Sequence, residues 1–253
     1  MIKLQLDAYA HLNTILHRWD PRYKTIGLMA LIFAFSFVQD LRLLPFMVLT
    51  TWILFVVSRL PLSFLLDRLR LPAYFLLIMA VLLPFLSGET VLFEIGPLAA
   101  KEEGCLQLLV ITVRFICILT VAIILFGTTP FLTTIKAMHA LGLPFILTDM
   151  AFFSYRYLYE IGDHLKTMER AMKMRGFQGR GLGAIGMFAS LAGTILVRSC
   201  EQSDRVYKAM SLRGYGRPRC FSEEFQAGLR DRIGLLIVIL VAMVFAGLQF
   251  IIR

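Results

Sequence analysis

Two short segments of this chain repeat each other, and both end in residue types suited to binding an acidic partner. Segment 170–177 reads Arg-Ala-Met-Lys-Met-Arg-Gly-Phe, and segment 208–215 reads Lys-Ala-Met-Ser-Leu-Arg-Gly-Tyr. Arginine presents a planar fork of donors that fits a carboxylate or the carbonyl groups at a helix end. The repeat therefore predicts two equivalent docking elements on a partner with two equivalent sites.

Each copy of the repeat places alanine and arginine four residues apart, so that both share one helix face. Alanine allows close approach of a partner backbone, and the glycine after the arginine is a common helix stop in the left-handed conformation. The predicted docking residues are Ala171, Arg175, Gly176, Ala209, Arg213 and Gly214. The alternative is that Arg-Gly is simply how basic helices end at a membrane surface.

These elements must be positioned by a largely apolar chain. Hydrophobic residues make up 58% of the 253, which indicates a polytopic membrane protein. Five hydrophobic segments are expected to span the bilayer as helices, because they lack the alternating pattern of a barrel strand. They cover residues 25–38, 43–57, 72–86, 105–126 and 233–252. The predicted fold class is therefore all-α, with about five transmembrane helices.

Charge distribution predicts the orientation of these spans. Basic residues precede the first span, separate the second from the third, and gather between the fourth and the last, whereas the 88–104 loop is acidic. The positive-inside rule then makes the N-terminus and the long polar region cytoplasmic. The expected organisation is a membrane part at 1–128, a cytoplasmic coupling region at 129–232 and a final span at 233–253.

The cytoplasmic region is expected to contain two long crossed coupling helices. Residues 154–175 carry one apolar helical stripe, with Glu169 and Lys173 at a favourable i, i+4 spacing on the opposite face. A glycine-rich bend follows, and then an apolar helix at 185–197 and a separate polar helix at 198–213. A crossed pair would hold the two Arg-Gly tips at separate points.

Two further segments give these features a family resemblance. Residues 17–24 read His-Arg-Trp-Asp-Pro-Arg-Tyr-Lys, and residues 154–158 read Ser-Tyr-Arg-Tyr-Leu. Together with the paired Arg-Gly tips they resemble the T component of energy-coupling-factor (ECF) transporters, in particular its cobalt/nickel branch, CbiQ. Trp19 stands where leucine is commoner in that family. The resemblance covers essentially the whole chain.

The resemblance implies a non-catalytic subunit of an ATP-driven importer in a prokaryotic inner membrane. Arg175 and Arg213 would each engage an acidic position on one of two ATPase subunits, which bind the ATP, and the coupling helices would move a small substrate-binding membrane subunit. A vitamin importer with a similar T component is one alternative. The other is a self-sufficient secondary permease or channel that its cytoplasmic helices regulate.

Other signals carry no prediction of chemistry. The chain has no phosphate-binding Gly-x-x-x-x-Gly-Lys-Ser/Thr loop, and the Gly-x-Gly-x-x-Gly pattern at 181–186 lacks a preceding strand. The four histidines and four cysteines lack ligand-like spacing, so we expect no bound metal and no cofactor on this chain. Region 154–219 holds 12 basic and five acidic residues, which topology and partner docking explain without nucleic acid.

Arg114 is the one clear charge inside a predicted span. Such residues are costly in lipid and are therefore candidates for function. The alternative is a structural arginine bonded to backbone carbonyls or to hydroxyls such as those of Thr112 and Thr120. The sequence does not decide between these two roles.

Overall fold

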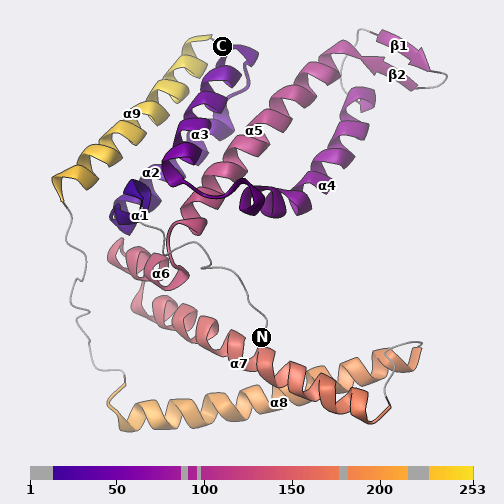
Figure 1. Ribbon diagram of the computed structural model, residues 1–253, viewed down its shortest axis with the longest axis vertical. Coiled ribbons are helices and arrows are strands. Elements are labelled where there is room, and N and C mark those ends of the chain that lie inside the picture. Colours follow the sequence, from indigo (N-terminus) through magenta and orange to yellow (C-terminus); the bar gives the residue numbers. More distant parts are fainter. Residues whose placement is uncertain (1–13, 87–90, 96–97, 177–181, 216–227, 253) are drawn as a thin grey trace. The chain divides into compact units, whose positions relative to one another are not determined.

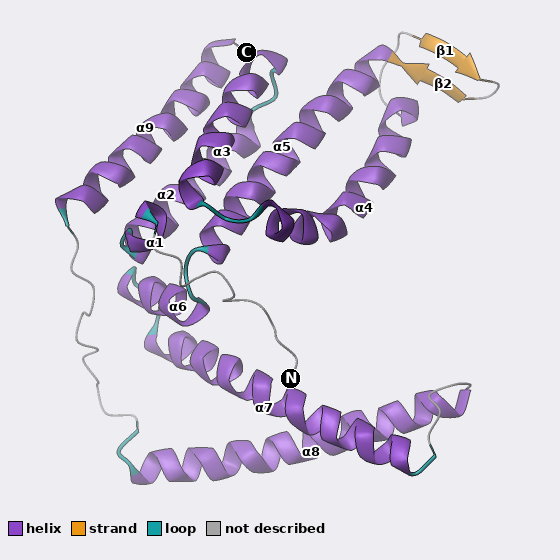
Figure 2. Ribbon diagram, in the orientation of Figure 1, coloured by secondary structure: helices purple, strands orange, loops and turns teal. Residues whose placement is uncertain are grey.

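The computed structural model describes residues 14–86, 91–95, 98–176, 182–215 and 228–252, which form two compact units (Figure 1; Figure 2). One unit contains two long helices of the predicted cytoplasmic region, and the other contains every remaining element. The division follows Gly142, so that residues 129–142, predicted to begin the cytoplasmic region, belong to the same unit as the predicted membrane helices.

The larger unit, here called the membrane unit, is mainly helical. Its helices are α1 (Ile15–Arg18), α2 (Pro21–Phe37), α3 (Leu44–Ser58), α4 (Leu62–Leu86), α5 (Glu102–Gly127), α6 (Phe131–Ala140) and α9 (Leu229–Ile252), with a 3₁₀ turn at Leu41–Leu43. The predicted loop before α5 contains an antiparallel hairpin of β1 (Val91–Ile95) and β2 (Leu98–Lys101). Helices dominate the unit, as the sequence predicts, and the hairpin is an addition that the sequence analysis missed.

The segment 17–24, singled out in the sequence, contains the first turn of α2 and also contacts the start of α9. Pro21 occupies the first helical turn, and the Asp20 carboxylate caps the helix by accepting the Arg22 N–H at 2.9 Å. The Trp19 indole N–H donates to the Asp231 carbonyl at 3.1 Å. A Cβ at Gly234 would lie 3.2 Å from the Trp19 ring, so this glycine allows the indole to lie against α9.

The core of the membrane unit is arranged around α2, which contacts α5, α6 and α9. Leu28, Leu31 and Phe35 of α2 are almost fully buried, and Phe35 packs edge-on against Phe245 of α9 with ring centroids 5.3 Å apart. The same apolar cluster includes Met47 of α3 and side chains of α5. The predicted first and last spans therefore lie side by side.

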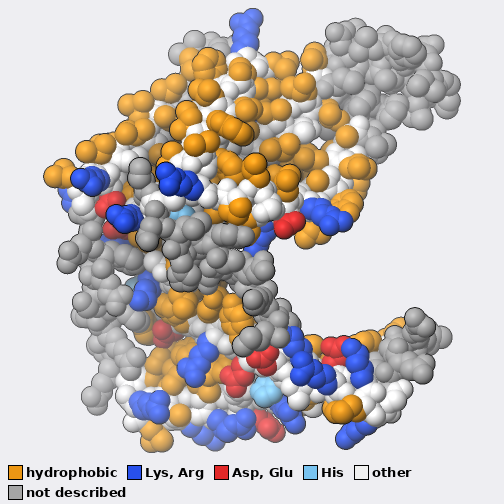
Figure 3. Space-filling view, viewed as in Figure 1, with side chains coloured by type: hydrophobic (Ala, Val, Ile, Leu, Met, Phe, Trp, Pro, Cys, Tyr) orange, Lys and Arg blue, Asp and Glu red, His pale blue; other side chains and the backbone are white. Residues whose placement is uncertain are grey.

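Three of the helices in the described residues are long and apolar enough to cross a membrane. They cover Leu41–Ser58, Leu106–Gly127 and Leu229–Gln249, which match the predicted second, fourth and fifth spans. The predicted first span lies in α2, which has 17 residues, and the predicted third is the second part of α4, which begins ten residues earlier at Leu62. Apolar side chains cover most of the visible face of this unit (Figure 3).

Candidate functional site: two arginine–glycine helix tips

The smaller unit, here called the coupling unit, consists of α7 (Phe145–Met174) and α8 (Leu182–Leu212). Pro144 precedes the first turn of α7, where its fixed φ favours helix entry. Charged side chains gather on these two helices in the visible face (Figure 3). The glycine-rich bend between them falls partly on 177–181, outside the described residues.

One predicted boundary in this unit was wrong. The stretches expected at 185–197 and 198–213 form one continuous helix. The helix that carries the predicted 154–175 stripe extends further toward the N-terminus and begins at Phe145. The change from apolar to polar residues at Arg198 does not interrupt the backbone, because no proline or paired glycine stands there to break the hydrogen bonds.

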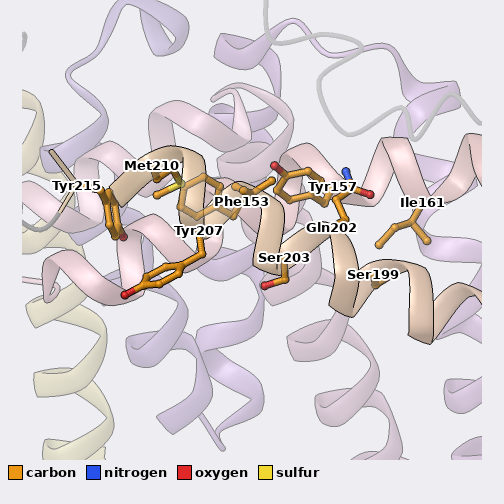
Figure 4. A pocket seen from close by; sticks show the side chains of 10 residues that line it. Phe153, Tyr157, Ile161, Ser199, Gln202, Ser203, Tyr207, Met210 and Tyr215 are labelled. Atoms are coloured by element: carbon orange, nitrogen blue, oxygen red, sulfur yellow. The ribbon is translucent and has the colours of Figure 1, made fainter. Parts of the chain in front are cut away.

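The two helices run antiparallel and contact each other, as two polar bonds show. The Gln202 amide donates to the Glu160 carboxylate at 2.8 Å. The Tyr215 hydroxyl, beyond the end of α8, donates to Asp149 Oδ2 near the start of α7 at 2.6 Å. Between these bonds lies a cavity of about 310 Å³, lined by Phe153 and Tyr157 among others (Figure 4). These two bonds therefore flank the cavity in the part of the pair where the first half of α7 lies beside the second half of α8.

The first tip, at the end of α7, has the predicted glycine stop. The Arg175 N–H donates to the Ala171 carbonyl at 3.2 Å, and the Gly176 N–H donates to the Lys173 carbonyl at 3.1 Å. Gly176 has φ +86°, in the region where a side chain would clash with the backbone. Nothing lies within 4 Å of a Cβ built at this glycine, so the turn is set by the backbone alone.

The second tip, at the end of α8, forms the same turn. The Gly214 N–H donates to the Ser211 carbonyl at 3.1 Å, and Gly214 has φ +80°. The Tyr215 N–H donates to the Met210 carbonyl at 3.0 Å, which completes a Schellman cap. Phe177, the counterpart of Tyr215 in the first tip, lies outside the described residues.

Both arginines of the repeat are exposed. The structure gives neither guanidinium an ion pair or hydrogen bond within the described part of the chain. Ala171 is half-buried and Ala209 is exposed. The two tips are not brought together, because the antiparallel pairing places them at opposite ends of the helix pair (Figure 1). Asp149, beside the second tip, is 26 residues from Arg175, or about 39 Å along a straight helix.

An ion pair lies in the last two turns of α7, next to the first tip. Lys173 Nζ lies 2.6 Å from Glu169 Oε1 at the i, i+4 spacing that the sequence predicts. The hydrogen bond from Lys173, followed by its charge, lowers the pKa of the Glu169 carboxyl below its usual value. Because both side chains are well exposed, water screens this pair and it stabilises the helix end only slightly.

Arg114 lies in α5 of the membrane unit and does not belong to the tips. Its Nη1 donates to the Ser36 carbonyl at 3.2 Å and to the Val38 carbonyl at 3.1 Å. These carbonyls terminate α2, where the helix dipole favours a positive charge. The structure thus favours the role of a structural arginine bonded to backbone carbonyls. These carbonyls belong to the end of α2, whereas the sequence also suggests the hydroxyl groups of Thr112 and Thr120 as partners.

The described residues contain no group of three or more His, Cys, Asp or Glu side chains that could hold a metal ion. His139 and His164 lie in different units, and His11 lies outside the described residues. The polar features of the coupling unit are thus helix ends and edge contacts.

Comparison with known proteins shows which family this chain belongs to. The CbiQ family profile, described as cobalt transport protein, matches residues 12–222. The chain belongs to this family. It is also similar to proteins named energy-coupling factor transporter transmembrane protein EcfT. The protein of Streptococcus equi subsp. equi is 26% identical over 262 residues, covering 96% of each chain. That of Listeria innocua is 27% identical over 230 residues, covering 85% of this chain and 86% of the other.

The Staphylococcus aureus protein of the same name is 26% identical over 265 residues, covering 98% of each chain. These full-length matches and the three apolar helices make this CbiQ-family chain a multi-pass membrane protein. The resemblance to the T component, first seen in short motifs, therefore extends along the whole chain.

Sequence reasoning missed the contact between Tyr215 and Asp149. One signal was present in the last residue of the repeat. The first copy ends in Phe177 and the second in Tyr215, which differs from phenylalanine only by its hydroxyl group. A half-buried tyrosine hydroxyl generally requires a partner. The partner itself was not predictable, because Asp149 lies 66 residues away in the sequence.

Proposed function

We propose that this CbiQ-family chain is the energy-coupling T component of an ECF-type importer. It is a non-catalytic subunit in a prokaryotic inner membrane, with its N-terminus and coupling helices in the cytoplasm. Two ATPase subunits bind and hydrolyse ATP, and each receives one Arg-Gly tip. Movement of the coupling unit is then passed to a small membrane subunit that binds the substrate.

The pair of matching tips is the observation that carries this proposal. Both end in a glycine with positive φ and the same amide-to-carbonyl bond, and both expose an arginine. A partner with two related acidic grooves would bind both, because an arginine fork and a carboxylate form a charge-assisted pair. Their placement at opposite ends of one helix pair suits an ATPase dimer, whose closure would displace both tips together.

We propose cobalt or nickel ions as the transported substrate. The family description, cobalt transport protein, supports this assignment, whereas the names of the EcfT relatives specify no substrate. The ion would bind to the small partner subunit, and this chain would transmit force. A vitamin as cargo is the competing assignment within the same coupling mechanism.

The test is to purify the tagged full-length chain from native membranes and identify co-purifying proteins by mass spectrometry. We expect P-loop ATPase subunits and one small membrane protein, and uptake of labelled Co²⁺ or Ni²⁺ by cells that express the set. The double variant Arg175→Glu/Arg213→Glu should lose the ATPases and the uptake but still insert into the membrane.

Arg205→Glu is the control for each of the two substitutions, because it makes the same single charge reversal at an exposed position two turns before the second tip. It should keep both the ATPases and the uptake. Uptake by the purified chain alone would contradict the proposal and favour a self-sufficient permease. Uptake of a vitamin in place of the metal ions would keep the coupling role and change the substrate.

A further inference from the structure

A cavity of about 320 Å³ lies in the membrane unit between α4, α5 and the start of α6. Most of its lining is apolar, from Phe64, Leu119, Ala122, Ile123, Phe126 and Phe131. It lies at the Gly127 end of α5, which is also one end of a membrane-spanning segment. This position places apolar walls at the depth where lipid chains meet their headgroups.

The shape of this cavity depends on the first turns of α4. A Cβ on Gly127 would lie 3.1 Å from the Phe64 ring, so the glycine allows α4 to approach the end of α5. Phe64 and Leu65 pack against a second buried cluster that contains Leu60 and Ile124. The first turns of α4 are thereby fixed against α5, and the cavity beside them is part of the fold.

A positive charge and a hydroxyl group lie beside the apolar walls. Arg68 contributes to the lining, with its guanidinium carbon 5.3 Å from the centroid of the Phe64 ring. Thr129 also lines the cavity, and its hydroxyl accepts from Lys24 Nζ at 2.7 Å. Lys24 is only 1% exposed and does not itself line the cavity, so the charge that an occupant of the cavity can reach is that of Arg68.

We propose that this cavity binds an anionic phospholipid of the bilayer. One acyl chain lies against Phe64, Ala122 and Ile123, and the phosphate lies near Arg68, on the side where Thr129 covers Lys24. The orientation predicted from the basic residues puts this end of α5 in the cytoplasmic leaflet, whose anionic lipids attract basic residues. Apolar walls with a cationic edge complement such a lipid in both polarity and charge.

Native mass spectrometry of the purified full-length chain tests this site, with phosphatidylglycerol or phosphatidylcholine added at equal concentration. We expect phosphatidylglycerol to be retained about ten-fold better, because its net charge is negative. Arg68→Gln should lower this retention at least about five-fold through loss of a charge-assisted contact. Arg70→Gln is the matched control, since it makes the same change on the same helix at a residue that does not line the cavity.

Ala122→Phe tests the apolar part by filling the cavity, and should abolish phosphatidylglycerol retention while Arg68 is still present. Thermal unfolding identifies any variant that fails to fold, and Arg68 is exposed, so its replacement does not disturb the core. Equal retention of the two lipids would overturn the proposal. So would equal loss in Arg68→Gln and Arg70→Gln, or full retention in a folded Ala122→Phe variant.

Discussion

At the end of α7 and at the end of α8, the chain stops in the same way, with an exposed arginine followed by a glycine at φ near +80° to +86°. At the second tip, a tyrosine hydroxyl also joins the turn to Asp149 of the other helix. The first copy of the repeat has phenylalanine at that position. The shared part is local backbone chemistry, and the difference lies in how a tip is anchored to its neighbour.

The largest expected effect comes from reversing one arginine at a time. Arg175→Glu and Arg213→Glu should each weaken ATPase binding by about 2 kcal/mol or more, roughly 30-fold, because an acidic groove then faces a like charge. Titration of the purified ATPase onto each variant measures this loss. Equal losses indicate two equivalent grooves, and unequal losses indicate two different ATPase subunits. No loss in either variant would contradict docking by these arginines.

The glycines test whether the shared turn matters equally at both tips. Gly176→Ala and Gly214→Ala should each cost about 1–2 kcal/mol, because alanine resists the left-handed conformation. Nothing else lies within 4 Å of either Cβ, so the cost should be the same at both. Thermal unfolding and ATPase titration provide the measurement.

Gly193→Ala is the control for this pair, since Gly193 lies inside α8 with nothing within 4 Å of its Cβ. Alanine should stabilise that position by about 0.5–1 kcal/mol, because it is the better helix former. Destabilisation at all three glycines would show that the left-handed turn is not what makes the tips sensitive.

Removing the hydroxyl group from Tyr215 should make the second tip resemble the first. Tyr215→Phe is expected to cost about 1 kcal/mol, so that the tip amides exchange hydrogen roughly five-fold faster. Asp149→Ala should have the same effect, and the double variant should add little to either. Tyr207→Phe, at an exposed tyrosine two turns earlier in α8, should change nothing. An equal effect there would contradict a specific anchor.

The smallest effect is expected at the Glu169–Lys173 pair beside the first tip. Because the pKa of Glu169 is lowered in the folded chain, its stabilising contribution is present above the unfolded value and is lost as pH falls through the folded one. Glu169→Gln should therefore slightly lower the melting temperature at pH 7 and leave it unchanged near pH ~3. A larger difference at acidic pH than at pH 7 would contradict this assignment.

Local features of the coupling unit were predictable from the sequence. The stripe of 154–175, the Glu169–Lys173 spacing and the glycine stops all depend on residues within about one or two helical turns. The three helices that are long and apolar enough to cross a membrane were predictable for the same reason, since each is a continuous apolar segment. Boundaries failed where polarity changed without a helix breaker, as at Arg198.

Contacts between distant segments were not predictable in detail. Arg114 was recognised as unusual, but its carbonyl partners at the end of α2 lie 76 and 78 residues away. The pairing of Asp149 with Tyr215, the indole of Trp19 against α9 and the cavity beside Arg68 also depend on how separate helices meet. The spacing of apolar residues predicts which face of a helix is buried. It does not predict which residues of another helix contact that face.

The position of α2 has a consequence for how the chain links its two units. The coupling unit is an excursion of the chain that leaves the membrane unit after α6 and rejoins it at α9. Both of these helices pack on α2. Both connections between the two units therefore lead to helices that pack on one helix, α2, and Arg114 binds the carbonyl groups at the C-terminal end of that helix.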